Sequence, residues 1–352
     1  MRMRCVLPLA ALCLAAAGAC RRATHGDAAA EPTKPVRVRE VRRPMGTYMA
    51  ITVYARNEGT GRKAIEAAFK RVEQVEAAIS TWRSDSDSAR LHDEAGGARL
   101  QVSPHLLAVL TRAVEVSRET DGAFDITVGP LIKLYRRSFR RRMLPPEDEL
   151  AAARAKVGYQ GIEVDAKHGT ARLAKAGMRV DFGAIGKGYI VDQALAALRE
   201  LGIEAALVDA GGDLYALGSP PDREGWRIGV RDPAHPTEIL DRPLLARNCA
   251  VATSGDYEQF ADIGGRRYSH IVDPRTGRPV EHMSSVTVIA RDATTADAYA
   301  TACSVLGPKD AVAFAEKRAG VEVLLMYRDG AVLRSAKSSG FARYIAPATP
   351  AP

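Results

Sequence analysis

A glycine-rich turn lies at the centre of the stretch Asp181-Phe-Gly-Ala-Ile-Gly-Lys-Gly-Tyr-Ile-Val-Asp192. Met178–Phe182 has the composition of a short strand, and apolar residues recur at helical spacing after the turn. The pattern predicts a helix over Lys187–Leu201, with Gly202 where glycine commonly ends a helix. A helix that begins at such a turn presents unpaired N–H groups and the positive end of its dipole, which favour a bound phosphate.

This turn has two interpretations. Lys187 supplies a cation and Asp181 an acceptor, which suits a ligand site. Glycine turns between a strand and a helix are nevertheless common, and most of them bind nothing. The glycine spacing is neither that of a P-loop nor the G-x-G-x-x-G order of a dinucleotide site. The turn alone therefore leaves open both a ligand site and a plain connection.

The N-terminal residues predict export and lipidation. Arg2 and Arg4 precede the apolar run Val6–Ala17, which is too short to span a bilayer. The run is followed by small residues directly before Cys20, which resembles a bacterial lipoprotein signal. We expect residues 1–19 to be a signal peptide and Cys20 to carry the lipid, on the periplasmic side of a bacterial membrane. Ordinary cleavage near Ala19, which would give a soluble periplasmic protein, is the alternative.

Composition divides the remaining chain into a tether, one large domain and a tail. Residues 20–42 are rich in Ala, Pro and charge, which predicts a flexible tether. Residues 43–346 are expected to form the folded domain, with residues 347–352 as a tail. No later segment has the apolar run of a membrane helix, so the lipid is the only membrane attachment that we predict.

Charge and cysteine content restrict the function class. The formal net charge is +8, and part of it lies in the leader, the tether and the cluster Tyr135–Arg142. An exported protein does not meet the chromosome, so nucleic-acid binding is disfavoured. The cluster is most simply a solvated loop, with anionic lipid headgroups or an acidic partner as alternatives. Cys249 and Cys303 could pair in an oxidising compartment or remain two buried thiols.

The order of elements predicts an α+β fold with mainly antiparallel sheets and packed helices, because strands come in hairpins with helices between them. Strand-like segments are Thr47–Tyr54, Gly161–Val164, Thr170–Leu173, Met178–Phe182, Ala205–Asp209, Leu214–Gly218, Trp226–Val230, Cys249–Ser254, Tyr268–Val272, Ser285–Ala290, Val321–Tyr327 and Ala331–Ser335. Helices are expected at Thr60–Ile79, Pro104–Thr120, Glu147–Val157, Lys187–Leu201, Thr295–Leu306 and Lys309–Arg318.

Two further segments carry residues with chemical potential. Asp297 and Thr301 are four residues apart on a predicted helix, so a carboxylate and a hydroxyl share one face and suit Mg²⁺ or Ca²⁺. Two ligands alone do not define a site, and both residues could instead be structural. His270 lies near the end of a predicted strand, before a tight Asp-Pro-x-Thr-Gly turn, and could act as a general base. A lone histidine is more often structural.

Taken together, these blocks resemble the ApbE family of FAD:protein FMN transferases. The blocks that carry the resemblance are Met45–Thr47, Gly122–Thr127, Asp181–Asp192, Val208–Asp213, Ala252–Tyr257, His270–Gly277 and Ala296–Thr301, in the order of the family. The resemblance covers nearly all of the chain after the tether. It implies a T-fold-like, two-lobed single domain with an FAD cleft.

The resemblance also implies a reaction. FAD is the substrate, Mg²⁺ lies on its pyrophosphate, and the hydroxyl of a Thr or Ser in an acceptor protein attacks the FMN phosphorus. AMP leaves and FMN stays joined to the acceptor. Acceptors of the family resemble redox-complex subunits that face the same compartment.

Residue roles follow from the same resemblance. The metal ligands would be Asp297, Thr301 and the backbone carbonyl of Ala184. His270 would be the base that takes the acceptor proton, and Asp297 could share that role. Asp181 and Lys187 would hold FAD. The other residues expected in the FAD pocket are Met45, Trp82, Ala123, Phe124, Asp125 and Ile271.

The chain departs from the family pattern at the expected pocket rim. It has Trp82 where the family usually has Tyr, Asp87 for Glu, and His92 for an amide. Two other functions remain open on the sequence alone. A Mg²⁺-dependent FAD pyrophosphatase would use water in place of the acceptor hydroxyl, and a non-catalytic lipoprotein would bind FAD without turnover.

Overall fold

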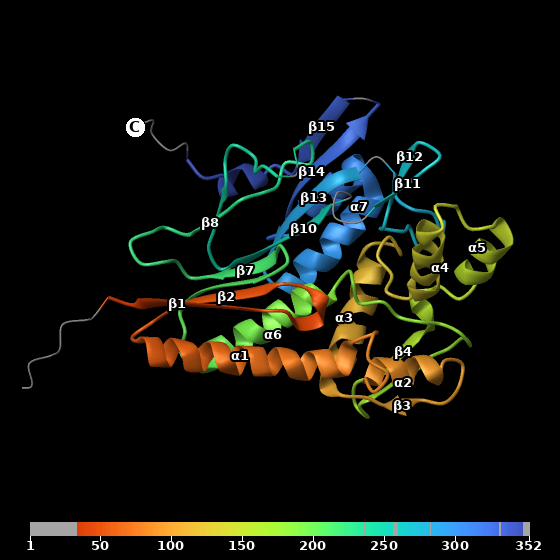
Figure 1. The fold of residues 1–352 in the computed structure, drawn as a ribbon, viewed down its shortest axis with the longest axis horizontal. Coiled ribbons are helices and arrows are strands. Elements are labelled where there is room, and N and C mark those ends of the chain that lie inside the picture. The colour runs from red at the N-terminus through yellow and green to blue at the C-terminus, as the bar shows by residue number, and fades with distance from the viewer. Residues whose placement is uncertain (1–33, 236, 256–259, 282, 331, 348–352) are drawn as a thin grey trace, which may run out of the picture. The chain divides into compact units, whose positions relative to one another are not determined.

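The computed structural model describes residues 34–235, 237–255, 260–281, 283–330 and 332–347. The predicted signal peptide, Cys20, the first part of the tether and the end of the tail lie outside these residues. Within them, no helix combines the length and apolar character needed to cross a membrane. Figure 1 shows the arrangement of the elements.

An antiparallel sheet forms the centre of the described part of the chain and confirms the predicted α+β class. Its order is β1-β2-β6-β7-β10-β13-β14-β15, and every neighbouring pair is antiparallel. The strands are β1 (Val36–Arg42), β2 (Met49–Ala55), β6 (Ala205–Ala210), β7 (Asp213–Leu217), β10 (Cys249–Gly255), β13 (Met283–Ala290), β14 (Glu322–Asp329) and β15 (Val332–Lys337).

Helices α1 (Glu58–Ile79), α6 (Gly186–Glu200) and α7 (Ala293–Glu316) pack beside this sheet, and α6 lies between the other two. Apolar residues of these helices and of the strands form the main core. Side-chain caps begin several helices: Asn57 caps α1, Ser103 caps α3 (Pro104–Glu119) and Asp292 caps α7. Such caps satisfy N–H groups that have no partner inside the helix.

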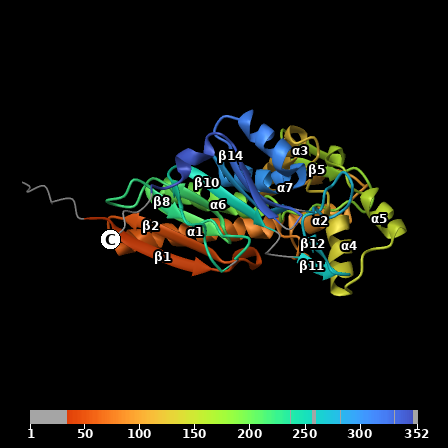
Figure 2. The same ribbon diagram turned by 90° about the horizontal axis from the view of Figure 1, so that it is seen from above.

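Smaller elements surround the central sheet. The helices are α2 (Asp87–Asp93), α4 (Gly129–Arg140) and α5 (Glu147–Arg154), with short 3₁₀ turns at Pro44–Gly46, Tyr159–Gly161 and Phe341–Tyr344. A small sheet has the order β3 (Leu100–Gln101), β5 (Thr170–Leu173), β4 (Ile162–Asp165), and two strand pairs are β8 (Trp226–Ile228) with β9 (Leu244–Ala246) and β11 (Phe260–Ile263) with β12 (Arg266–Ser269). Figures 1 and 2 both place the β11–β12 pair beside α4.

The predicted tether extends too far along the chain. Residues 36–42 were assigned to it, yet they form β1, which pairs with β2 from Val36 opposite Ala55 to Arg42 opposite Met49. Because β1 is an edge strand, it needs few apolar residues, and of its side chains only Val38 is buried. The many charged residues of β1 therefore hid its strand character in the sequence.

The arginine cluster is not the predicted solvated loop, because most of it belongs to helix α4. Tyr135 and Ser138 are buried together with Leu131 and Leu134, whereas Arg136 and Arg137 are exposed. The run of arginines is the exposed side of an amphipathic helix whose other side packs inward.

Two of the predicted strands are not regular strands in the structure. Met178–Phe182 is extended but makes only an isolated bridge, between Arg179 and Val128, because the Val180 N–H is donated to His92 Nε2 and not to a strand. β12 ends at Ser269, so Tyr268–Val272 is not one strand. The break expected between the two C-terminal helices is confirmed: within α7, Gly307 has non-helical φ and ψ of 79° and 172°, and Pro308 follows it.

Helices α6 and α7 cross at very close range. A Cβ atom on Gly188 would lie 2.1 Å from the carbonyl oxygen of Ala293. Asp192 of α6 also accepts hydrogen bonds from the first turn of α7, at 2.9 Å from Ala293 N and 2.8 Å from Thr294 N. The crossing is thus fixed by backbone contact and by a carboxylate at the positive end of a helix dipole.

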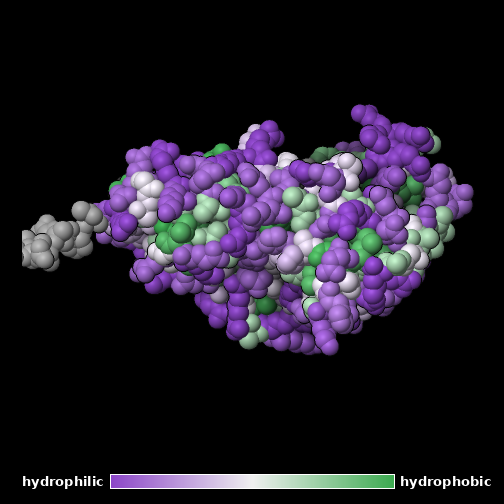
Figure 3. Space-filling view, turned by 90° about the horizontal axis from the view of Figure 1, so that it is seen from below, coloured by the Kyte–Doolittle hydropathy of each residue, from purple (hydrophilic) through white to green (hydrophobic). Residues whose placement is uncertain are grey.

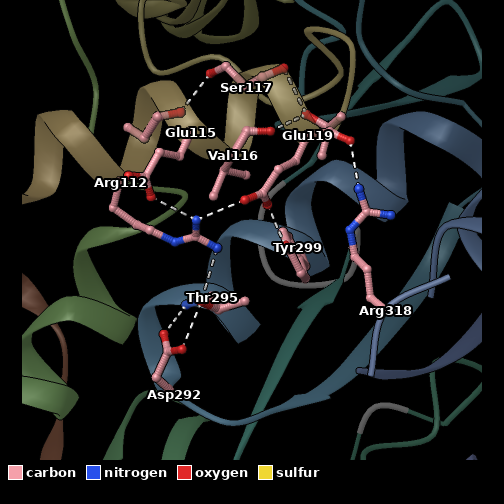
Figure 4. A network of polar contacts seen from close by, with 11 residues as sticks. Arg112, Glu115, Val116, Ser117, Glu119, Asp292, Thr295, Tyr299 and Arg318 are labelled. Carbon is pink, nitrogen blue, oxygen red and sulfur yellow. Dashed lines mark hydrogen bonds and ion pairs between the residues drawn. The ribbon is translucent and has the colours of Figure 1, made fainter. Parts of the chain in front are cut away.

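A polar network ties α7 to α3 (Figure 4). Arg112 donates to Glu119 at 3.0 Å and to Thr295 Oγ1 at 3.3 Å, and Tyr299 donates to Glu119. Arg318 donates to the Glu119 carbonyl at 2.9 Å. α7 is therefore held by both α6 and α3, which limits its freedom to shift.

We predict that Gly188→Ala destabilises the protein by about 3 kcal/mol or forces α6 and α7 apart, because overpacking at backbone is costly. Gly59→Ala is the matched control, since its Cβ would meet only the Asn57 side chain, at 3.6 Å. Alanine in a helix should leave stability unchanged or raise it by less than about 1 kcal/mol. Urea denaturation measures both variants. Equal free energies of unfolding for the two variants would contradict the conclusion that the backbones of α6 and α7 touch at Gly188.

Candidate active site

A cavity of about 580 Å³ lies between α4, the turn before α6, the end of β10, the segment after β12, and α7. This volume falls within the usual range for small-molecule sites. Its walls are formed by Ala123, Phe124, Asp125, Val128, Ile132, Tyr135, Arg136, Phe139, Asp181, Gly183, Ala184, Lys187, Thr253, Ser254, Gly255, Phe260, His270, Ile271, Val272, Pro274, Asp297 and Thr301. Figure 3 shows one face of the molecule, where apolar residues form separate patches within a mostly hydrophilic surface.

Most residues predicted for the site lie on this cavity, although they come from distant parts of the chain. The fold brings together the predicted residues Ala123, Phe124, Asp125, Asp181, Ala184, Lys187, His270, Ile271, Asp297 and Thr301. Such convergence supports one site in which the turn before α6, the first half of α7 and the segment after β12 act together.

Two predicted pocket residues do not line the cavity. Met45 packs against the core near the start of α6, where a Cβ on Gly186 would lie 3.5 Å from its Cε. Trp82 is 78% exposed, with the guanidinium of Arg136 stacked 4.8 Å from its ring centre. Because Arg136 does line the cavity, Trp82 lies next to its rim. The contact of both residues with FAD stays a prediction.

Asp125 has a structural task that the sequence did not indicate. Its carboxylate accepts the Thr127 N–H at 2.8 Å, the Thr127 hydroxyl at 2.7 Å and the Tyr159 N–H at 2.7 Å. Burial raises the pKa of this carboxyl, and the three donors oppose the rise. Asp125 therefore shapes the cavity wall by holding two loops together.

Hydrogen bonds fix the conformation of the turn before α6 and of the extended segment that leads into it. Asp181 donates its N–H to the Ile126 carbonyl at 2.7 Å, and its Oδ1 accepts the Gly183 N–H at 2.9 Å. One residue earlier, His92 Nε2 accepts the Val180 N–H at 3.0 Å. The Asp181 carboxylate also lies 3.7 Å from Arg136. These contacts fix where Ala184 and Lys187 enter the cavity.

A buried charge cluster forms the inner end of the site. Asp297 is 3% exposed and its Oδ2 accepts the Gly188 N–H at 2.9 Å. Asp213 is 1% exposed and its Oδ2 lies 2.7 Å from Lys187 Nζ. Burial raises the pKa of both carboxyls, the Asp213 charge raises that of Asp297 further, and the Lys187 ammonium opposes both shifts.

The sequence-based site lacked Asp213 and the wall formed by α4. Asp213 follows Gly211 and Gly212 at the start of a strand. The glycines indicated a turn in the sequence, but nothing there showed that Asp213 pairs with Lys187. Ile132, Tyr135, Arg136 and Phe139 recur at helical spacing. That spacing is the signal which could have revealed α4 as a cavity wall.

The residues present fit a hard divalent cation. Ala184, Asp297 and Thr301 meet on one cavity, and the last two share a face of α7. In the part of the chain that the structure describes, no group of three His, Cys, Asp or Glu side chains forms a metal site. Carbonyl, hydroxyl and carboxylate oxygens beside a second buried carboxylate suit Mg²⁺ or Ca²⁺ and not Zn²⁺.

The two cysteines within the described residues are free thiols. Cys249 on β10 and Cys303 on α7 are both buried, and burial raises the pKa of Cys303 to about 12. Of the two interpretations that the sequence left open, the buried thiols are confirmed.

A sequence profile of the ApbE family matches residues 45–325. The chain belongs to the ApbE family. An FAD:protein FMN transferase of Treponema pallidum is 37% identical over 319 residues, covering 85% of this chain and 88% of that relative. One from Salmonella typhimurium is 31% identical and covers 86% and 87% of the two chains.

Solved structures of ApbE proteins share the fold. The flavin transferase ApbE from Vibrio cholerae superposes with a TM-score of 0.79 at 30% identity, covering 88% of this chain and 99% of that one. The ApbE protein of Thermotoga maritima gives 0.79 at 31% identity, covering 89% and 100%. The resemblance expected from the sequence blocks is therefore confirmed at the level of family and fold.

We predict that His92 makes stability fall on mild acidification. Burial, assisted by the nearby charge of Arg179, lowers the pKa of His92 from 6.5 to about 4. Below pH 6.5 the unfolded chain binds a proton that the folded chain refuses, so stability is lost as the pH falls toward 4. His92 should contribute a loss of about 2 kcal/mol between pH 7 and pH 5.

His92→Asn removes this titration and keeps an acceptor for the Val180 N–H. Urea denaturation of both proteins at pH 7 and pH 5 measures the difference. An identical loss of stability in the two proteins would show that His92 does not titrate in this way.

Proposed function

We propose that this protein transfers FMN from FAD to a Thr or Ser hydroxyl of an acceptor protein and releases AMP. The observation that carries the proposal is the meeting of Ala184, Lys187, His270, Asp297 and Thr301 on one cavity. The relatives named FAD:protein FMN transferase, which match most of the chain, support the same reaction.

The proposed reaction is a phosphoryl-group substitution. The acceptor oxygen forms a bond to the phosphorus of the FMN half of FAD, and the bond from that phosphorus to the bridging oxygen breaks. AMP leaves with the bridging oxygen. His270, at the cavity wall, takes the hydroxyl proton. The acceptor gains FMN through a phosphoester bond, and the cavity limits the access of competing water.

Residues around the inner end of the cavity would hold the cation and the substrate. The Ala184 carbonyl, the Asp297 carboxylate and the Thr301 hydroxyl would hold Mg²⁺, with Ca²⁺ as a second possible ion. Bound there, the ion supplies positive charge to the pyrophosphate and polarises the attacked phosphorus. Ala123, Phe124 and Ile271 offer apolar wall for the flavin, and Asp181 offers an acceptor.

The proposal includes a location. Lipidation of Cys20 would anchor the chain at the periplasmic side of a bacterial membrane, and the residues before β1 would serve as the tether. Acceptors would then be redox-complex subunits that face the same compartment. The basic n-region, the short apolar run and the small residues before Cys20 support this part of the proposal.

FMN transfer is tested with mature protein, FAD, Mg²⁺ and a candidate acceptor domain. We expect the acceptor to gain the mass of FMN and AMP to appear in equal amount. AMP without a mass gain would favour FAD hydrolysis instead, and retained FAD with neither product would contradict both enzymatic functions. Intact-mass spectrometry and AMP quantification provide the two measurements.

In the same assay, Asp297→Ala should reduce Mg²⁺-dependent transfer by at least about 100-fold, because it removes a metal ligand. Asp310→Ala, at an exposed carboxylate on the same helix, is the matched control and should retain activity. Full activity of Asp297→Ala would refute the proposed metal site.

Localisation is tested by Cys20→Ser. The wild-type protein is expected in the membrane fraction and to incorporate a radiolabelled fatty acid, whereas the variant should do neither. A soluble, unlabelled wild-type protein would contradict lipidation and favour ordinary signal cleavage.

A further inference from the structure

We propose that Asp213 is a positioning residue which holds the Lys187 ammonium away from Asp297 and so keeps Asp297 available to a divalent cation. The inference rests on the metal site of the proposed function and deepens it. It gives Lys187 and Asp213 one shared task, distinct from direct contact with FAD.

Asp213 is placed by the backbone with little freedom. It is the first residue of β7 and pairs with Ala210 across a two-residue hairpin loop. Gly211 and Gly212, which form the loop, have φ of +64° and +97°, a conformation that suits glycine. β10 adds a third contact, because Asp213 Oδ1 accepts the Thr253 N–H at 3.3 Å. The carboxylate is therefore a fixed anchor and not a mobile surface group.

The ammonium of Lys187 pairs with the Asp213 carboxylate, next to Asp297. Its Nζ is 2.7 Å from Asp213 Oδ2, and the next residue in the chain, Gly188, donates its N–H to Asp297 Oδ2 at 2.9 Å. Burial raises the pKa of both carboxyls and the Lys187 charge opposes both rises, so the ammonium acts on Asp297 as well as on Asp213. Lys187 lines the cavity together with Asp297 and Thr301.

Competition between a lysine and a metal ion follows from this arrangement. An ammonium that pairs with Asp297 would have to be displaced before a cation could bind there, and a buried ion pair is strong because the local dielectric constant is low. With Asp213 ionised, Lys187 has a partner of its own. Without that charge, Asp297 is a nearby carboxylate that the ammonium would approach.

The arrangement has two competing explanations. Asp213 could itself be a metal ligand, in which case its loss would weaken metal binding whatever stands at position 187. It could also serve only the fold, in which case its loss would lower stability and leave metal affinity alone. The proposal and these two alternatives differ in how a second substitution, at Lys187, changes the effect of losing Asp213 on metal affinity.

The test is a double-mutant cycle of Asp213→Asn and Lys187→Met, read out as Mn²⁺ affinity by electron paramagnetic resonance without FAD. We expect Asp213→Asn to weaken Mn²⁺ binding by about tenfold or more, because the ammonium now competes for Asp297. The double variant should bind within about threefold of wild type, because the competing charge is gone. Asp209→Asn removes one charge from the same hairpin and should also stay within about threefold.

Three outcomes overturn the inference. The first is an unchanged affinity in Asp213→Asn, and the second is a double variant that binds no better than Asp213→Asn alone. If Asp213→Asn does not fold, as thermal melting would show, Lys187→Met decides alone: it should bind Mn²⁺ at least as tightly as wild type, and weaker binding is the third overturning outcome.

The same titration separates this inference from the proposed function. Wild-type protein that binds no Mn²⁺ would overturn both the metal site and the role of Asp213. Wild-type protein that binds Mn²⁺ and shows the expected cycle, but transfers no FMN, would overturn only the proposed function.

Discussion

The close crossing of α6 and α7 is the contact on which the site depends. Gly188 lets the two backbones approach, and its N–H then reaches the Asp297 carboxylate at 2.9 Å. Asp192 binds the first turn of α7 from the same helix, so the crossing has no freedom to slide. The glycine turn before α6 and the face of α7 that carries Asp297 and Thr301 thus become two walls of one cavity, although more than 100 residues separate Gly188 from Asp297.

Charge burial at this crossing is costly to the fold and useful to the chemistry. Two nearly inaccessible carboxylates lie beside one lysine, and burial disfavours their ionised forms. A fold selected for stability alone would gain little from this cluster, because a buried ion pair seldom outweighs its desolvation. Its position at the inner end of the cavity fits a site that holds a cation and a polyanionic substrate.

The predictable parts of the fold are those whose signal is local. The periodicity of α1, α3 and α6 and the cap at Ser103 identified their helices with bounds close to those observed. β1 was missed because an edge strand buries little, and α4 was missed because its arginines dominate its composition. Met178–Phe182 looked like a strand, but Val180 donates its N–H to a histidine side chain of α2, which leaves only an isolated bridge at Arg179.

The family, the fold class and most of the residues that meet on the cavity could be predicted from the amino-acid sequence alone. Those properties depend on residue type and spacing along the chain, which are visible without coordinates. The pairing of Lys187 with Asp213, the structural task of Asp125 and the place of α4 in the cavity wall became visible only in the folded protein. Hydrogen bonds and ion pairs act over a few ångströms, and which distant groups come that close is set by how the helices and the sheet pack.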